Sequence, residues 1–194
     1  MLYYLINSTH WAWVQFFIVI SNSSNPEPQI FISLLVFIIL YLMKNKLEAI
    51  CCAFNICATG LTNLILKNTV KRLRPMEIRL IDAHGYSFPS GHASISTAIA
   101  IVLIYFMFKK IKNKKIAYIL SGLIIIYLIL VAISRVYLGV HYPTDILGGW
   151  VIAGIWSYIT ISAYRFCMSK GVNKFLDKYF TIKLNIFKHK SKPI

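Results

Sequence analysis

Long stretches of the chain carry almost no charge, and they constrain its fold more than any other feature of the sequence. A helix needs about 20 residues to cross the hydrocarbon core of a bilayer, and four of the five stretches come close to that length. The five stretches are Ile30–Met43, which is the short one, Leu47–Leu66, Ser90–Phe108, Ile116–Ile133 and Ile146–Tyr164. Only 14% of the 194 residues are charged, against about 25% in a soluble domain. The sequence therefore predicts an all-α, polytopic transmembrane helix bundle.

The number of spans depends on the N-terminal part of the chain. Ile30–Met43 reaches across a bilayer if the lysines that follow it extend to the interface. Leu2–Ile20 is apolar but is interrupted by polar residues, and it contains Trp11 and Trp13. Tryptophan prefers the headgroup zone of a membrane. We therefore expect an interfacial or partly inserted N-terminal helix, and five to six spans in total.

The net charge of +15 is distributed unevenly along the chain. If successive loops alternate between the two sides of the membrane, most basic residues fall on one side, including Lys109–Lys115 and those from Arg165 onward. The positive-inside rule makes that side cytoplasmic. We expect a multi-pass protein of the inner (plasma) membrane, with a membrane domain over residues 1–164 and a basic cytoplasmic tail over 165–194. Its partner is the lipid bilayer, and no nucleic acid is expected.

Six of the 21 Lys and Arg residues fall on the predicted outer side: Lys67, Lys71, Arg72, Arg74, Arg79 and Arg135. Lys67, Lys71 and Arg74 are spaced i, i+4, i+7, which predicts that they share one face of a helix ended by Pro75. An anion between them would relieve the repulsion of three like charges. The cluster is equally consistent with a solvated helix end beside lipid headgroups.

The segment Ser90-Gly91-His92 stands directly before an apolar helix. Ser90 is a natural N-cap, and Gly91 allows another group to approach the backbone closely. The free N–H groups and the dipole at a helix start bind phosphate readily, and His92 stands beside them. Taken alone, the segment is also explained as a capped helix with an interfacial histidine.

A third group of polar residues follows on the same predicted side. Arg135 ends one apolar stretch, and His141 and Asp145 precede the next one at a spacing of four residues. A carboxylate at that spacing can hold one imidazole nitrogen and leave the other free to attack, although a lone aspartate at a helix start is commonly explained by the helix dipole. Together the three segments favour phosphoryl transfer. The sequence has no cluster of carboxylates for magnesium, so we expect neither a metal nor another cofactor.

In these residues the chain resembles the type-2 phosphatidic acid phosphatase family, which is related to vanadium haloperoxidases and bacterial acid phosphatases. Three family signatures occur in order over Lys67–Asp145: K-x6-R-P, P-S-G-H and S-R-x5-H-x3-D. The resemblance implies that His141 is a nucleophile that forms a phosphohistidine, that Asp145 orients it, and that His92 is the general acid. It implies that the phosphate is held by Lys67, Arg74, Ser90, Gly91 and Arg135.

The resemblance also implies a membrane lipid phosphate as the substrate and an active site on the extracytoplasmic face. Bacterial members of this size resemble undecaprenyl pyrophosphate and phosphatidylglycerophosphate phosphatases, and we favour undecaprenyl pyrophosphate. Phosphatidylglycerophosphate, phosphatidate and lipid A phosphates are the alternatives. A catalytically silent lipid-binding protein would be expected to lose its histidines, whereas His92 and His141 are both present. An anion transporter would carry charges at mid-membrane depth, whereas nearly all charges here lie at predicted helix ends. The sequence leaves the oligomeric state open.

Overall fold

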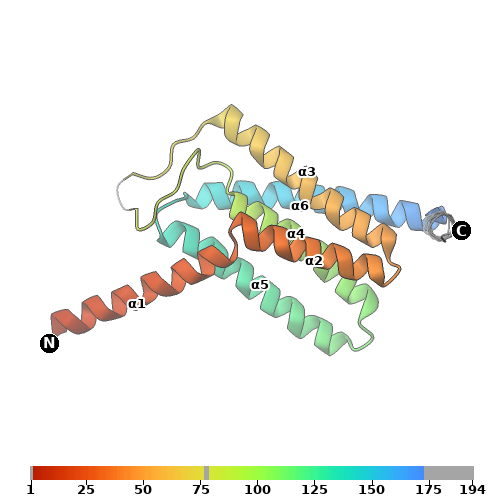
Figure 1. The fold of residues 1–194 in the computed structure, drawn as a ribbon, viewed down its shortest axis with the longest axis horizontal. Helices are drawn as coiled ribbons and strands as arrows, with labels where there is room; N and C mark the ends of the chain where they lie inside the picture. Colours follow the sequence, from red (N-terminus) through yellow and green to blue (C-terminus); the bar gives the residue numbers. More distant parts are fainter. Residues whose placement is uncertain (1, 77–78, 173–194) are drawn as a thin grey trace, which may run out of the picture.

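The computed structural model describes residues 2–76 and 79–172, and this part of the chain contains helices and loops but no strand. The helices are α1 (Leu2–Ser23), α2 (Pro26–Leu42), α3 (Lys46–Val70), α4 (Gly91–Lys110), α5 (Lys114–Tyr137) and α6 (Pro143–Ser169) (Figure 1). The predicted all-α class is confirmed. The first residues of the predicted tail, to Ser169, belong to α6, and 173–194 lie outside the described residues.

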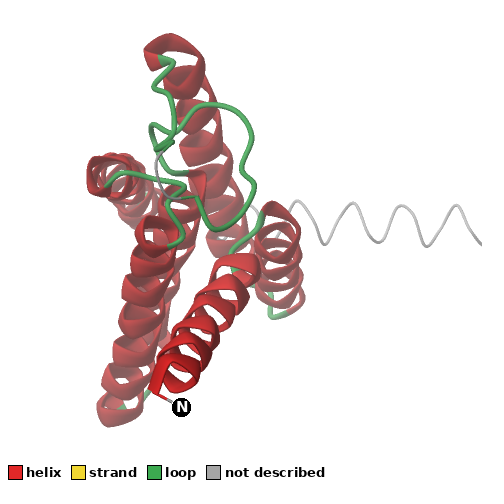
Figure 2. Ribbon diagram, turned by 90° about the vertical axis from the view of Figure 1, so that its left-hand side faces the viewer, coloured by secondary structure: helices red, strands yellow, loops and turns green. Residues whose placement is uncertain are grey.

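Helix α4 lies at the centre of the bundle and packs against α2, α3, α5 and α6, while α1 packs along α5. Away from this contact, α1 points out of the bundle toward the N-terminus (Figure 1). The loops between α3 and α4 and between α5 and α6 lie at one end of the molecule. Figure 2, which views the molecule from that end, shows the long α3–α4 loop lying across the helix ends. This arrangement brings the three predicted motif segments to one end of the bundle.

Four helices, α3 to α6, are long and apolar enough to cross a membrane, which makes the chain a multi-pass membrane protein. Helix α2 has 17 residues, about 26 Å at 1.5 Å per residue, and so is shorter than the hydrocarbon core of about 30 Å. The segments His10–Ser23 and Pro26–Leu42 pass the same test only together, as a pair bent by 46°. The structure thus supports four spans, or five if the bent pair is one span, and five is the lower of the two predicted numbers. The bend arises at Asn25 and Pro26, because a proline begins α2 and cannot continue α1.

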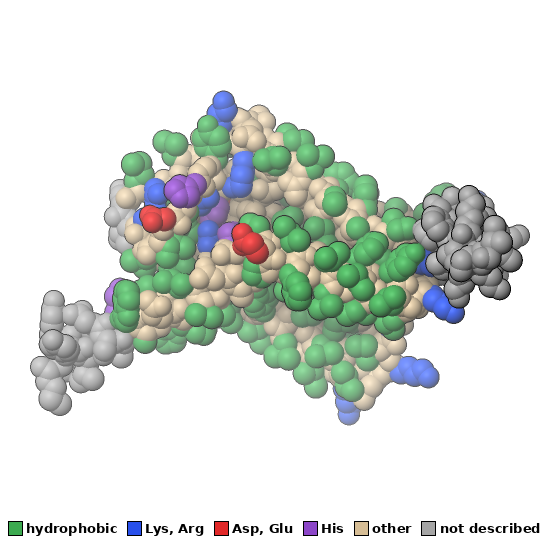
Figure 3. Space-filling view, in the orientation of Figure 1, with side chains coloured by type: hydrophobic (Ala, Val, Ile, Leu, Met, Phe, Trp, Pro, Cys, Tyr) green, Lys and Arg blue, Asp and Glu red, His purple; other side chains and the backbone are tan. Residues whose placement is uncertain are grey.

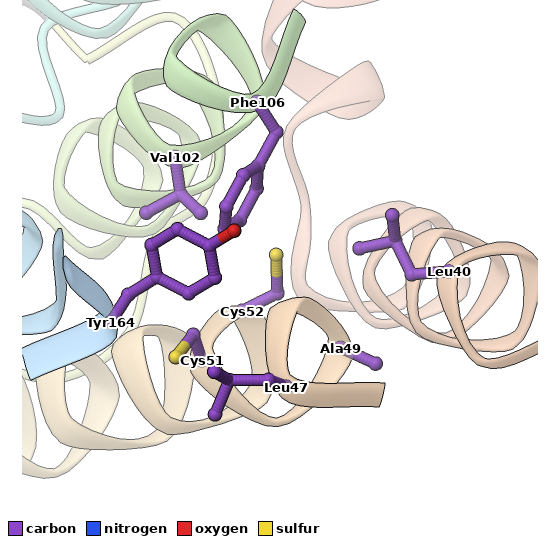
Figure 4. Packing of buried hydrophobic residues seen from close by; sticks show 8 residues of the cluster. All are labelled: Leu40, Leu47, Ala49, Cys51, Cys52, Val102, Phe106 and Tyr164. Carbon is purple, nitrogen blue, oxygen red and sulfur yellow. The ribbon is translucent and has the colours of Figure 1, made fainter. Parts of the chain in front are cut away.

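A hydrophobic cluster holds the helices together at the end opposite the loops (Figure 4). It consists of Leu40, Leu47, Ala49, Cys51, Cys52, Val102, Phe106 and Tyr164. The buried carboxylate of Glu48 lies beside it, accepts a hydrogen bond from the Tyr164 hydroxyl at 3.0 Å and pairs with Lys110 at 2.6 Å. A buried charge is stable only when it is paired and hydrogen-bonded. These contacts therefore join α3, α4 and α6 at this end.

Two buried asparagines of α3 fix the position of α4. Asn55 donates to the Ala98 carbonyl at 2.9 Å, and Asn63 donates to the Ser94 hydroxyl at the same distance. Inside a membrane such side chains find partners on neighbouring helices, because no water is available. Asn63 lies one turn from Lys67, so its bond sets the start of α4 against the end of α3.

Gly149 of α6 permits a close approach of the backbone at the start of α4. A Cβ atom at this position would lie 2.9 Å from the Ser90 carbonyl oxygen and 3.1 Å from the Ser94 nitrogen. We expect Gly149→Ala to push the start of α4 away and to destabilise the protein by about 1–3 kcal/mol. Gly154→Ala on the same helix is the control, since nothing lies within 4 Å of its added Cβ. Thermal unfolding in detergent should show a lower midpoint for Gly149→Ala only, and equal midpoints would contradict the packing described here.

Candidate active site

Basic and histidine side chains gather at the end of the bundle that carries the loops. Figure 3 shows Lys, Arg and His side chains there, while hydrophobic side chains cover the flanks of the helices. Further basic side chains lie at the opposite end of the molecule. The loops between α3 and α4 and between α5 and α6 bring the three motifs together at the loop end of the bundle.

His141 is held from both sides by buried or half-buried polar groups. Its Nδ1 atom lies 3.3 Å from Asp145 Oδ2, as the spacing predicted, and its Nε2 atom lies 3.3 Å from Arg74 Nη1. A carboxylate only accepts hydrogen bonds and a guanidinium only donates them. The neutral ring therefore carries its proton on Nδ1 and a lone pair on Nε2. The Tyr142 backbone N–H also donates to Asp145 Oδ2, at 2.9 Å, which fixes the carboxylate.

The surroundings keep the His141 ring neutral. The pKa of His141 is lowered to about 4, mainly by burial and in addition by the positive charges of Arg135, Arg74 and Lys67, while the hydrogen bond with Asp145 opposes the shift. Burial also lowers the pKa of Arg74. At neutral pH the imidazole is therefore unprotonated, with a lone pair available on Nε2.

Arg74 reaches His141 from a loop and not from a helix. Helix α3 ends at Val70, and Lys71 closes it in the left-handed conformation, with φ 52° and a hydrogen bond from its N–H to the Lys67 carbonyl. The prediction that Lys67, Lys71 and Arg74 share one helix face was therefore wrong. The chain leaves the helix before Pro75, and Arg74 folds back to donate to three loop carbonyls. These belong to His84 at 2.9 Å, Gly85 at 3.0 Å and Val140 at 2.9 Å.

Two other predicted phosphate-binding residues lie at the end of α3 and at the start of α4. Lys67 donates to the Tyr86 carbonyl at 2.8 Å. Ser90 is the N-cap of α4, as predicted, and its hydroxyl accepts from the Ala93 N–H at 3.4 Å. Its own backbone N–H donates to the Asp145 carbonyl at 3.0 Å, which ties the start of α4 to the start of α6.

Residues of the α1–α2 bend contact two of the predicted site residues. Asn25 Oδ1 lies 2.9 Å from His92 Nε2, and Arg135 donates from Nη1 to the Ser21 hydroxyl. Arg135 is buried, and none of the described residues accepts a hydrogen bond from its Nε atom. No role for this bend was predicted from the sequence. The polar run Ser21–Asn25 between two apolar segments is the signal that would have suggested a site contact.

Arg72 is a second residue that sequence reasoning did not place. Its Nη1 atom donates to Asp145 Oδ1 at 3.0 Å and to the Thr144 hydroxyl at 2.6 Å. Its guanidinium carbon lies 4.1 Å from the centre of the Tyr142 ring, an arrangement that favours a cation–π contact. Asp145 is therefore held by Arg72 through one oxygen and holds His141 through the other.

A cavity of about 600 Å³ opens at this site. Five of the eight predicted residues line its polar end: Lys67, Arg74, Gly91, His92 and His141. Ser90, Arg135 and Asp145 do not line it and are buried behind it. From the polar end the cavity continues between α2, α3 and α4. There its walls are apolar and include Ile30, Leu34, Phe37, Ile56 and Ile95.

The fold and the site define a multi-pass membrane protein in which helix ends and loops enclose a cationic, histidine-lined cavity with an apolar extension. Residues 48–169 match the PAP2 superfamily, so the chain belongs to this family, as the three motifs indicated. The matched region contains every residue predicted for the site. It does not include α1, α2 or the bend between them.

Several curated proteins are similar to parts of this chain. Phosphatidylglycerophosphatase B of Bacillus subtilis (strain 168) is 44% identical over 94 residues, which cover 46% of this chain and 45% of that protein. An undecaprenyl-diphosphatase of Sulfolobus acidocaldarius is 38% identical over 76 residues, covering 39% and 32%. A lipid A 4′-phosphatase of Bacteroides thetaiotaomicron is 30% identical over 113 residues, covering 53% and 47%. The matches thus span less than half the length of these relatives.

Two solved structures share the fold. The transmembrane PAP2-type phosphatidylglycerolphosphate phosphatase of Bacillus subtilis superposes with a TM-score of 0.68 at 27% identity, over 77% of this chain and 75% of that chain. Aquifex aeolicus LpxE superposes with a TM-score of 0.54 at 23% identity, over 76% and 93%, and this likeness concerns the fold alone.

Proposed function

We propose that this protein is an integral-membrane lipid phosphatase that acts through a phosphohistidine intermediate without a metal. The observation that carries the proposal is the shape of the cavity. Its polar end presents Lys67, Arg74, His92 and His141, and its continuation between α2, α3 and α4 is apolar. A lipid phosphate has the matching division, with a charged headgroup and hydrocarbon chains. A soluble phosphate ester would gain nothing from the apolar walls.

In the first step, the Nε2 lone pair of His141 attacks phosphorus. A P–N bond forms and the bond between phosphorus and the leaving oxygen breaks. His92 enters this step as an imidazolium, stabilised by the negative charge of the bound phosphate, and gives one of its two protons to the leaving oxygen. Attack requires Arg74 to leave Nε2 and to bind a phosphate oxygen. The buried Arg135 Nε donor, which has no acceptor among the described residues, is suited to a second phosphate oxygen.

In the second step, water attacks the phosphohistidine. The proton of the water returns to His92, the P–N bond breaks, and His141 is restored with inorganic phosphate as the product. Asp145 stays hydrogen-bonded to Nδ1 and stabilises the positive charge that develops on the ring. Within residues 2–76 and 79–172, no three His, Cys, Asp or Glu side chains come together to hold a metal ion. We therefore assign the stabilisation of the phosphate charge to Lys67, Arg74 and Arg135.

As the substrate we propose undecaprenyl diphosphate, which would be hydrolysed to undecaprenyl phosphate. Three cations and the free N–H groups at the start of α4 suit the high charge of a diphosphate. Similar proteins are named for phosphatidylglycerophosphate, undecaprenyl diphosphate and lipid A. Phosphatidylglycerophosphate is therefore the first alternative, followed by phosphatidate and lipid A phosphates.

Release of phosphate by the purified protein in detergent with EDTA tests this proposal. The panel contains undecaprenyl diphosphate, phosphatidylglycerophosphate, phosphatidate and lipid A. We expect release that resists EDTA and is fastest with undecaprenyl diphosphate. Loss of phosphate release in EDTA would contradict the metal-free chemistry. A faster rate with another lipid would make that lipid the proposed substrate in place of undecaprenyl diphosphate. No release from any of the lipids would favour a catalytically silent lipid-binding protein.

We further propose that the site faces the extracytoplasmic side of the inner membrane. Lys44, Lys109 and Lys110 lie at the ends of α2 and α4 opposite the site, and the positive-inside rule makes their side cytoplasmic. Cysteine introduced at Arg79 should react with a membrane-impermeant maleimide in intact cells, whereas cysteine introduced at Lys112 should not. The reverse pattern would place the site in the cytoplasm.

The pH dependence of kcat/KM should reflect the low pKa of His141. Attack needs the neutral ring, so activity is lost as the pH falls through this pKa, which lies at about 4 rather than at the usual value of about 6.5. After correction for ionisation of the substrate, the acid limb is expected near pH 4. Arg74→Gln removes a positive charge that lowers the pKa, so its residual activity should show an acid limb at higher pH. A wild-type acid limb near pH 6.5, or a shift to lower pH in Arg74→Gln, would contradict this account.

A further inference from the structure

Asn25, at the bend between α1 and α2, makes one contact that the mechanism above does not use. Its side-chain Oδ1 lies 2.9 Å from Nε2 of His92. An amide oxygen only accepts hydrogen bonds, so His92 carries a proton on Nε2 in this arrangement. The neighbouring Asn22 supports the orientation of the amide, because Asn25 Nδ2 faces Asn22 Oδ1 at 3.5 Å. The opposite orientation would place two oxygens against each other.

The position of Asn25 in its own helix gives a second, independent observation. Asn25 is the N-cap of α2, and an N-cap asparagine normally accepts a hydrogen bond from the N–H of the second or third helical residue. Here its side chain makes no such bond. The third helical residue is Pro28, which has no N–H. The side chain is therefore turned away from its local role and toward His92.

The start of α2 is also fixed against the start of α4 by Gln29, one turn after Asn25. The buried Gln29 amide donates to the Ser96 hydroxyl at 2.9 Å and to the His92 carbonyl at 3.4 Å. Two residues at i and i+4 on one face of α2 thus contact the first turns of α4. The distance between Asn25 and His92 is set by packed helices and not by a free loop.

From these contacts we propose that Asn25 is a positioning residue for the general acid: its carbonyl oxygen holds Nε2–H of His92, which fixes the ring and leaves the other nitrogen for proton transfer. This inference rests on the proposed function. With a phosphate bound, His92 enters the first step protonated on both nitrogens, and Nδ1 gives its proton to the leaving oxygen; in the second step Nδ1 takes the proton of the attacking water. The Nε2 proton stays with Asn25 throughout. The bend between α1 and α2, which lies outside the PAP2 match, thereby becomes part of the active site.

Leaving-group dependence separates this role from a merely structural one. An alkyl phosphate such as phosphatidate needs a proton on its leaving oxygen, whereas a nitrophenyl phosphate with a long alkyl chain has a leaving group that needs none. We expect Asn25→Ala to lower kcat on phosphatidate by roughly 10–100-fold, the size of loss that a small misplacement causes. We expect a change of less than about threefold on the nitrophenyl lipid, since a general acid contributes only where the leaving group requires it.

Two further variants sharpen the test. Asn25→Asp keeps an acceptor oxygen facing His92 and should restore most of the rate on phosphatidate. Asn68→Ala is the matched control, because Asn68 is exposed and donates only to the Leu64 carbonyl of its own helix. It should change neither rate. In the double variant Asn25→Ala/His92→Ala, the rate on phosphatidate should equal that of His92→Ala alone, because Asn25 acts through His92.

The outcomes distinguish this inference from the function on which it rests. His92→Ala is expected to slow the hydrolysis of phosphatidate much more than that of the nitrophenyl lipid. If it does so while Asn25→Ala slows the hydrolysis of both lipids equally, or of neither, the role of Asn25 is overturned and that of His92 stands. Additive losses in the double variant would likewise overturn the role of Asn25. If His92→Ala slows both lipids equally, the assignment of His92 as the general acid fails first.

Discussion

Replacement of His141 by alanine is expected to lower phosphate release by about 10⁴-fold or more, the scale of loss seen when a catalytic nucleophile is removed. The reason is that Nε2 of His141 carries the lone pair that forms the P–N bond. Among the described residues that line the cavity, the other histidine is His92, which is bound to Asn25 and assigned to proton transfer. The measurement is single-turnover release of phosphate from undecaprenyl diphosphate at saturating enzyme.

His84→Ala is the matched control for this prediction. His84 lies in the loop that covers the site, its side chain is exposed, and it contributes to the site through its backbone carbonyl, which accepts from Arg74. Its substitution should change the rate by less than about threefold, as expected for an exposed side chain outside the reacting groups. A His141→Ala protein that is folded and retains more than about one per cent of the wild-type rate would sink the assignment of the nucleophile.

The second large effect is expected for Asp145→Asn, with a loss of about 10²–10⁴-fold in kcat, comparable to tautomer-disrupting changes at other catalytic histidines. Asp145 Oδ2 accepts from Nδ1 of His141 and from the Tyr142 N–H. In one orientation, the oxygen of the asparagine still accepts the hydrogen bond from the Tyr142 N–H, and its NH₂ group faces Arg72. The uncharged amide oxygen then holds His141 less firmly than the carboxylate does. An asparagine in the other orientation presents a donor to Nδ1, which favours the tautomer with no lone pair on Nε2.

Arg72→Gln separates the effect on His141 from the loss of the Arg72–Asp145 pair. The Arg72 side chain is about one-third exposed, so its ion pair is screened by solvent. We expect Arg72→Gln to lower kcat by less than about tenfold, because a partly exposed pair contributes modestly. Equal losses in Arg72→Gln and Asp145→Asn would mean that Asp145 acts mainly by holding Arg72, and that its role at His141 is wrong.

Most of the site could be predicted from the sequence because its residues lie at fixed positions relative to helix ends. The spacing of His141 and Asp145 predicted their contact, and the position of Ser90 before an apolar stretch predicted the cap of α4. The apolar stretches predicted α3, α4, α5 and α6. Local rules of this kind hold because the helix geometry that places such residues is the same in every protein.

The residues whose positions or contacts were not predicted from the sequence depend on contacts between distant segments or on the early end of a helix. Spacing alone placed Arg74 on a helix, whereas the left-handed Lys71 ends α3 before it. A non-glycine residue in this conformation leaves no reliable mark in a sequence. The contacts of Asn25 with His92 and of Arg72 with Asp145 join residues 67 and 73 positions apart. One sequence does not identify the partners in such pairs, and the contacts that the bend between α1 and α2 makes with the site likewise became visible only in the fold.

The most direct test of the central claim is to trap the phosphoenzyme. The purified protein is mixed with undecaprenyl diphosphate labelled with ³²P at the terminal phosphate and quenched in alkali within milliseconds, since phosphohistidine survives base and is lost in acid. The proposed mechanism predicts ³²P bound to His141 through Nε2 in the wild type, with no such label in His141→Ala. Phosphate release without a labelled intermediate on His141, or a label on another residue, would contradict it.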